Sequence, residues 1–202
     1  MGKTIRVLTA GIIGGALVFC AGAFNHMVLK LEGRAFSQFD KDDEVRAFLK
    51  ARDLKPGLYR FPSIDEKATD MTKEGERWNA AYKEGPSGLL VLAPAGEDAM
   101  GQPQLVAEFV SNMLAALIAA WIVSNLGTDS SYLWRWATVF SLGLFTWLST
   151  SASFGIWYRF PHEFIHDGLF CALIEWGVAG LVIAALVNPA APASLPEMPP
   201  AK

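Results

Sequence analysis

Hydrophobic positions along the chain fall into four long blocks, unlike the short periodic segments of a soluble domain. Each block has at most two charged positions and is long enough, at about 1.5 Å per helical residue, to cross a hydrocarbon core of roughly 30 Å. The blocks are Val7 to Phe24, Leu105 to Leu126, Trp136 to Trp157 and Phe164 to Val187. This pattern predicts four transmembrane helices.

A charged segment separates the first block from the second, and its pattern is that of a small mixed domain. Residues 40–52 carry apolar positions at helical spacing behind a run of aspartates, and residues 73–85 predict a second short helix. Residues 58–61 and 88–94 have the composition of short strands. We therefore expect an extramembrane α+β insert that is marginal as an independent domain.

These elements predict an all-α membrane protein with four transmembrane helices and a small extramembrane α+β insert between helices 1 and 2. The expected parts are helix 1 at residues 1–29, the insert at 30–103, a three-helix transmembrane bundle at 104–187 and a tail at 188–202. Short links between the last three helices favour a compact bundle. The tail is rich in Pro and Ala, a composition that predicts disorder.

Basic residues near the ends of the spans favour one orientation. Lys3 and Arg6 precede the first span and Arg135 precedes the third, whereas Arg159 alone lies in the short link on the other side. The positive-inside rule then predicts a cytoplasmic N-terminus and an insert on the outer side of the membrane. Basic residues after the first span, beginning at Lys30, favour the opposite orientation. The first block also matches a signal peptide, but its length favours an uncleaved anchor.

Composition limits the classes of function. The chain is 52% hydrophobic and 18% charged, as expected of a membrane protein. A formal net charge of −3 gives no attraction for polyanions, so we expect no nucleic acid as a partner. The expected partners are membrane lipids and either a protein partner or a second copy of the chain. The two cysteines, Cys20 and Cys171, both lie in predicted spans, which argues against a disulfide framework.

The entry to the fourth span contains the sequence HEFIH, which is a candidate zinc site. His162 and His166 would share one helical face, and Glu163 would be the general base toward a zinc-bound water. A third ligand would have to come from His26 or Glu108, which the alternation of spans places at the same interface. Because so short a motif also arises by chance, we expect no cofactor and keep a membrane-embedded zinc hydrolase as the alternative.

Acidic residues inside the predicted spans form a second candidate site. Glu175 lies near the middle of the fourth span, where a carboxylate costs at least about 2.5 kcal/mol. With Asp167 and Cys171 it forms a polar stripe that should face protein or water, and Glu108 is a further intramembrane carboxylate. We expect hydroxyl groups of the third span to bond to Glu175. A proton- or solute-handling subunit centred on Glu175 is a further alternative.

Small residues in the first span predict close helix packing. Gly11 and Gly15 form a G-x-x-x-G pattern, which lets a second helix approach closely, within the monomer or across an interface. We expect this face to be exposed and available for assembly. The sequence as a whole thus favours a non-catalytic structural or accessory subunit over an enzyme.

Four stretches add a further pattern: NHM at the end of the first span, PGLYRFP and YKEGPSGLLVLAPAG in the insert, and SASFGIWYRFP before the fourth span. With these stretches the chain resembles an uncharacterised family of small four-span bacterial membrane proteins with no assigned function. The resemblance implies the four-span architecture and a bacterial inner membrane, in which an insert on the outer side would be periplasmic. It also implies a contact between insert and bundle that involves Tyr59, Pro62, Trp157 and Tyr158.

Overall fold

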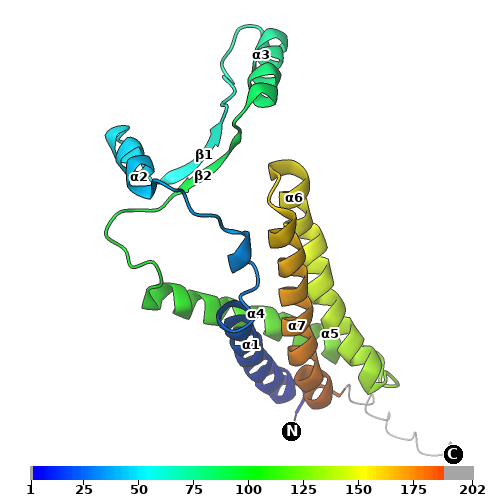
Figure 1. The fold of residues 1–202 in the computed structure, drawn as a ribbon. Helices are drawn as coiled ribbons and strands as arrows, with labels where there is room; N and C mark the ends of the chain where they lie inside the picture. The colour runs from blue at the N-terminus through cyan, green and yellow to red at the C-terminus, as the bar shows by residue number, and fades with distance from the viewer. Residues whose placement is uncertain (1, 189–202) are drawn as a thin grey trace, which may run out of the picture. The chain divides into compact units, whose positions relative to one another are not determined.

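The computed structural model describes residues 2–188 and is mostly helical, with one small two-stranded sheet (Figure 1). Within these residues, four helices are long and apolar enough to cross a membrane: Lys3–Met27, Gln102–Ser124, Tyr132–Tyr158 and His162–Leu186. This part of the prediction is confirmed, and it indicates a multi-pass membrane protein. The tail predicted to be disordered lies, apart from Asn188, outside the described residues.

The chain forms two compact units. Among the described residues, the helical unit contains 2–36, Gln102–Ile156 and 160–188, and the insert unit contains Ser37–Gly101 with Trp157–Arg159. The insert therefore begins later than the predicted residue 30. The reason is that the segment after the first helix, residues 28–36, packs on the fourth span before the chain enters the insert.

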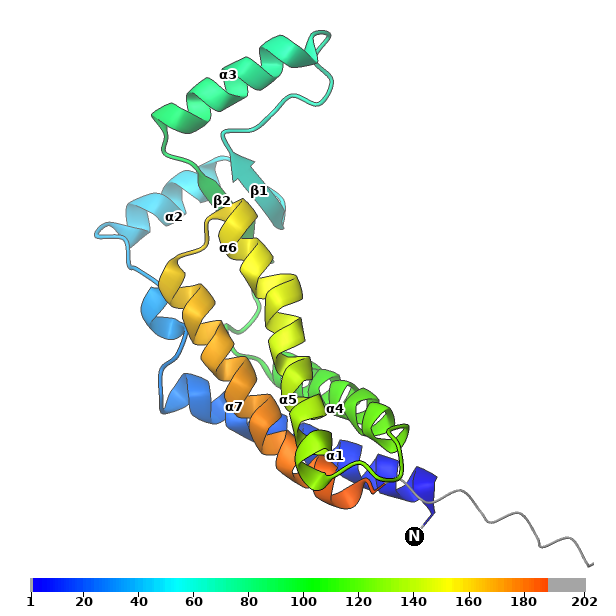
Figure 2. The same ribbon diagram turned by 90° about the vertical axis from the view of Figure 1, so that its right-hand side faces the viewer.

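The helical unit is built from α1 (Lys3–Met27), α4 (Gln102–Ser124), α5 (Tyr132–Thr146), α6 (Ala152–Tyr158) and α7 (His162–Leu186), with a π-helical turn, η2 (Trp147–Ser151), between α5 and α6. The main contacts join α1 to α4, α5 to α7 and α1 to α7, as Figures 1 and 2 show. Consecutive helices α4 and α5 share only a small contact. The structure thus differs from the expected bundle of residues 104–187, because α1 lies between α4 and α7.

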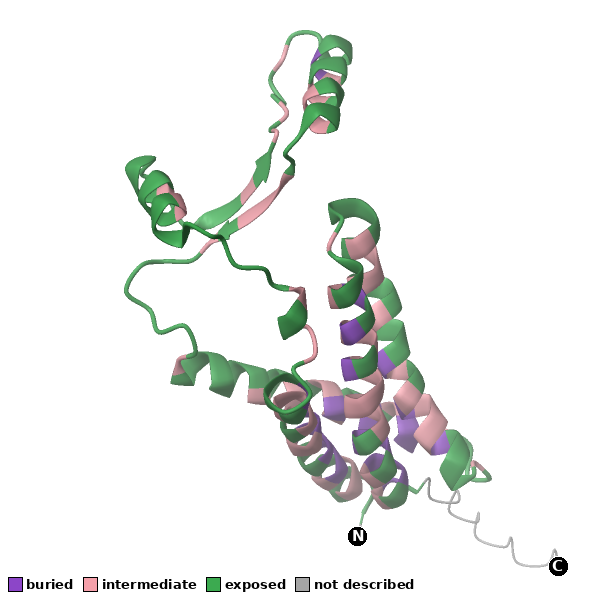
Figure 3. Cartoon of the chain, viewed as in Figure 1, coloured by how far each residue is buried: buried purple, intermediate pink, exposed green. Residues whose placement is uncertain are grey.

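Small side chains form the core of the helical unit, and Figure 3 shows the buried positions gathered where the long helices meet. A Cβ added at Gly15 would lie 2.5 Å from Met113 Cα, and one at Gly11 would lie 2.8 Å from Leu117 Cα. The expectation that this face of the first span is exposed is wrong. Its glycines are buried against α4, because direct backbone contact requires residues without side chains.

Side chains of the third span bind the backbone of α7. Four of them donate hydrogen bonds to α7 carbonyl oxygens. The bonds run from Tyr132 to Leu181, Arg135 to Ala184, Trp136 to Gly177 and Trp147 to Ile165, with donor–acceptor distances of 3.0, 3.0, 3.0 and 2.8 Å. A carbonyl oxygen has two lone pairs, so these bonds can add to the bonds within the helix.

The insert unit has the elements expected from its sequence, within a few residues. They are α2 (Asp42–Ala51), β1 (Gly57–Phe61), α3 (Met71–Glu84) and β2 (Gly88–Leu92). The strands pair antiparallel, from Gly57 opposite Leu92 to Phe61 opposite Gly88. Asp70 caps α3 by accepting bonds from the amides of Thr72 and Lys73, at 3.1 and 3.2 Å.

A buried carboxylate fixes the loop before α3 to that helix. Glu74 Oε1 accepts a bond from the Asp65 amide at 2.7 Å, and Arg77 Nε donates to Glu74 Oε2 at 2.6 Å. Arg77 also donates to the Ser63 carbonyl at 2.9 Å. The bonds from Arg77 and from the Asp65 amide lower the pKa of Glu74 to about 2.

We expect acid to destabilise the insert through this carboxylate. Because the pKa of Glu74 falls from 4.5 to about 2 on folding, the unfolded chain binds the proton first, and stability is lost as the pH falls through this window. Hydrogen exchange of the α3 amides, measured in the full chain, should show this loss in the wild type and a flatter profile in Glu74→Gln. A Glu76→Gln variant on the exposed side of α3 should keep the wild-type profile. Identical profiles in all three proteins would contradict the assignment.

Candidate functional site

Polar residues gather where α1 ends beside the first half of α7. The polar stripe of α7 faces this region: Asp167 and Cys171 are buried, and Glu175 is half-buried. Residues 28–36, which include a short helical turn, η1 (Gly33–Ala35), also contact α7. We call Asn25, Glu32, Arg34, Asp167 and Glu175 the polar cluster.

Asp167 is the most completely bonded member of the polar cluster. Its side chain is fully buried, and Oδ2 accepts bonds from Arg34 Nε at 2.7 Å and from the Glu32 amide at 2.9 Å. Arg34 Nη2 donates to Oδ1, which completes a two-pronged ion pair. The carboxylate charge is thus compensated, and residues 32 and 34 are fastened to α7.

Glu32 places a second carboxylate against α7. A Cβ added at Gly168 would lie 2.9 Å from Glu32 Oε1, so a glycine at this position leaves room for the carboxylate. Burial, the largest effect, raises the pKa of Glu32, and the nearby Asp167 charge raises it further, whereas His26 lowers it from 4.0 Å away. Lys30 and Glu32 have φ angles of 54° and 61°, an uncommon conformation that the contacts with α7 must hold in place.

Glu175 is bonded to α1. Asn25 is fully buried, and its Nδ2 donates to Glu175 Oε1 at 3.1 Å. A Cβ added at Gly22 would lie 3.3 Å from the same oxygen, so the carboxylate sits close against α1. Asn25 Oδ1 is buried and has no hydrogen-bond partner among residues 2–188, a situation that costs about 1–3 kcal/mol.

The expectation that hydroxyl groups of the third span bond to Glu175 is wrong. Ser141, Thr146 and Ser149 donate instead to backbone carbonyls of their own helical segment, at 2.7, 2.9 and 3.2 Å. Such local bonds are the usual alternative for hydroxyl side chains in helices.

Sequence reasoning missed Asn25 as the partner of Glu175, although Asn25 carries the one carboxamide side chain at or before the end of the first span.

The polar residues of HEFIH lie on the exposed side of the first turns of α7. His162, Glu163 and His166 are all exposed, and the two imidazole ring centres are 6.1 Å apart. Within residues 2–188 the structure contains no group of three or more His, Cys, Asp or Glu side chains placed to hold a metal ion. The histidine pair therefore has no third ligand in the described part of the chain.

The two residues expected as third ligands have other neighbours. His26 Nε2 lies 4.0 Å from Glu32 Oε2, at the edge of the polar cluster. Glu108 is exposed on α4, and its Oε1 accepts a bond from Asn112 Nδ2 at 3.1 Å. Glu108 thus lies on the outer surface of the described helices, in a helix that is long and apolar enough to cross a membrane.

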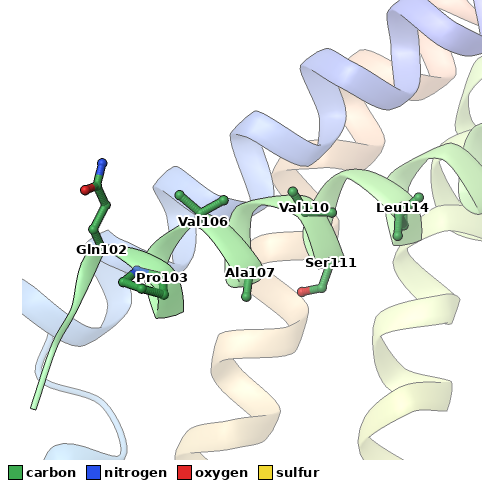
Figure 4. A pocket seen from close by; sticks show the side chains of 7 residues that line it. All are labelled: Gln102, Pro103, Val106, Ala107, Val110, Ser111 and Leu114. Carbon is green, nitrogen blue, oxygen red and sulfur yellow. The ribbon is translucent and has the colours of Figure 1, made fainter. Parts of the chain in front are cut away.

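An open apolar groove of about 660 Å³ runs along the first half of α4 (Figure 4). Its lining residues are Gln102, Pro103, Val106, Ala107, Val110, Ser111 and Leu114. Small-molecule sites combine an apolar wall with several convergent polar groups. Here the polar side chains are Gln102 and Ser111 alone among the lining residues, so the groove fits a lipid chain or an apolar helix better than a substrate.

The four residues expected to join insert and bundle all belong to the insert unit. Tyr59 Oη donates to the Lys55 carbonyl at 2.7 Å, and the Pro62 carbonyl accepts a bond from Trp78 Nε1 at 2.9 Å. Trp157 and Tyr158 belong to the insert unit. The contact between these two pairs of residues stays a prediction.

Comparison with known proteins does not identify a relative of this chain. No family model matches the chain, and neither a curated protein nor a solved structure does. The resemblance to small four-span bacterial membrane proteins stays a prediction.

Proposed function

We propose that this protein is a non-catalytic accessory subunit of the bacterial inner membrane, whose four spans anchor an insert that binds a protein partner. One observation carries the proposal. A catalytic site directs polar groups toward a space for the substrate. In the polar cluster, Arg34 and the Glu32 amide bond to Asp167 instead, and these bonds fasten the segment that leads into the insert.

The insert has an apolar surface that supports a partner there. Leu58 and Val91 are opposite each other in the strand register and are 69% and 77% exposed. A two-stranded sheet is marginally stable by itself and gains stability when an apolar face is covered. A protein partner that covers Leu58 and Val91 would provide this stabilisation.

The distribution of cations supports a cytoplasmic N-terminus and a periplasmic insert. Lys3, Arg6 and Arg135 lie at one end of the helical unit, where Lys3 bonds to Asn125 Oδ1 at 3.0 Å and Arg6 bonds to the Asn188 carbonyl at 3.3 Å. Arg135 bonds to the Ala184 carbonyl near the C-terminal end of α7, which a positive charge stabilises. Clustered cations are typical of the cytoplasmic side.

Crosslinking on intact cells tests partner and orientation together. A membrane-impermeant, amine-reactive crosslinker that passes the outer membrane should convert the 22.0 kDa chain into a larger species through lysines of the insert. A Leu58→Thr/Val91→Thr variant keeps strand-forming residues and should lose the larger species. Met100→Thr, which alters a residue 78% exposed in the insert unit, is the matched control and should retain it.

Three outcomes would contradict the proposal in different ways. A labelled chain that stays monomeric would show that the insert is periplasmic but has no partner. An unlabelled chain would overturn the orientation. Near-stoichiometric zinc in the purified protein that is lost in His166→Ala would favour the hydrolase over the accessory subunit.

A further inference from the structure

The pair formed by Asn25 and Glu175 is incomplete in a specific way. Asn25 Nδ2 donates to Glu175 Oε1 at 3.1 Å, while Asn25 Oδ1 is buried and has no partner among residues 2–188. A carboxamide can make two parallel bonds to a carboxyl group, one as donor and one as acceptor. The ionised carboxylate has only acceptors, so the second bond requires a hydrogen on Glu175.

Glu175 also has no cation as partner in the described part of the chain. The guanidinium of Arg34 is bonded to Asp167, which lies about two turns closer to the N-terminus of α7. No ion pair within residues 2–188 involves Glu175. The position is near the middle of an apolar span, where an unpaired charge is strongly disfavoured. Protonation removes that charge without any additional residue.

We propose that Glu175 binds a proton at neutral pH and that Asn25 and Glu175 form a buried proton-binding site. A proton from water adds to Glu175 Oε2, so the carboxylate becomes a neutral carboxylic acid. Oε1 continues to accept the bond from Asn25 Nδ2, and the new O–H donates to Asn25 Oδ1. The same step removes the buried charge and satisfies the orphan oxygen. This inference does not depend on the accessory function proposed above.

Titratable groups surround the pair on α1, on the segment after it, on α4 and on α7. From the end of α1 and the segment after it, His26 and Glu32 act on Glu175, and Glu108 does so from α4. Asp167 and Cys171 follow one another at one-turn intervals on α7 itself, and the Asp167 charge is matched by Arg34. No cation among these groups forms an ion pair with Glu175 in the described part of the chain, because Arg34 is paired with Asp167 and His26 lies nearest to Glu32.

Infrared difference spectroscopy in lipid nanodiscs tests the proposal on the full chain. At neutral pH, subtraction of the Glu175→Gln spectrum from that of the wild type should reveal the C=O band of a hydrogen-bonded carboxylic acid. That band should be replaced by carboxylate bands as the pH is raised. Glutamine offers the same acceptor and donor as the neutral acid, so this variant should fold. Glu108→Gln, which alters an exposed carboxylate of α4, should leave the acid band unchanged.

A second variant separates proton binding from simple burial. Asn25→Leu removes the acceptor for the proposed O–H, so the acid band should move to the frequency of a weaker hydrogen bond. Only carboxylate bands at neutral pH in the wild type would overturn the proposal. An acid band unaffected by Asn25→Leu would overturn the role of Asn25.

Discussion

A Gly15→Leu variant should be less stable than the wild type, so that its buried Cys171 reacts markedly faster with a thiol reagent. The new Cβ would lie 2.5 Å from Met113 Cα and 2.8 Å from Met113 N, which are backbone atoms of α4 and cannot rotate away. Overpacking usually costs about 1–3 kcal/mol and sometimes more, and a clash with backbone belongs at the upper end. The rate at which a thiol reagent labels buried Cys171, in a Cys20→Ser background, measures the opening of the helical unit.

The matched control is the same substitution where space is open. A Cβ added at Gly75 meets no atom within 4 Å, and leucine is a better helix former than glycine, so Gly75→Leu should leave the labelling of Cys171 unchanged. If Gly15→Leu behaved like this control, the close packing of α1 on α4 would be refuted.

Arg34→Met should release residues 28–36 from α7 and expose Cys171 to labelling. The substitution leaves the fully buried Asp167 carboxylate without a cation, which is the costly way to break such a pair. Because the Arg34 side chain is 61% exposed, water and salt screen the pair, and the loss should be smaller than for a fully buried pair. We expect labelling to accelerate by at least about tenfold.

Two further variants make the Arg34 result specific. An Arg34→Met/Asp167→Leu double variant replaces both charges with apolar groups and should recover much of the lost stability. Arg46→Met removes an exposed pair with Asp43, at 3.5 Å, and should have no measurable effect. A double variant as unstable as Arg34→Met would show that the ion pair is not what holds the segment.

The four spans could be predicted because the thickness of the membrane sets their length and composition, and both can be read locally. The order of packing could not. The G-x-x-x-G pattern at Gly11 and Gly15 predicts a close neighbour, but Met113 and Leu117 of α4 carry no pattern that identifies them as that neighbour. No local sequence pattern predicts that α1 packs between α4 and α7.

The candidate sites show the same division. The spacing of His162 and His166 places both on one side of a helix, but a metal site needs a third group from elsewhere, which depends on tertiary structure. The hydroxyl groups of the third span predict a partner for Glu175 in the neighbouring helix, but its partner is Asn25, which is 150 residues away in the sequence. The helices and strands of the insert could be predicted, because an Asp-rich helix start and the composition of strands are local signals.

The bonds from the third span to α7 have a consequence for how this sequence can change over time. All four donors are side chains of the helical segment from Tyr132 to Trp147, whereas every acceptor is a main-chain oxygen that any residue would supply. The side chains that set the register of this helix pair through hydrogen bonds therefore belong to one helix only. Substitutions at the four acceptor residues, Ile165, Gly177, Leu181 and Ala184, can therefore accumulate as far as packing permits without loss of these hydrogen bonds.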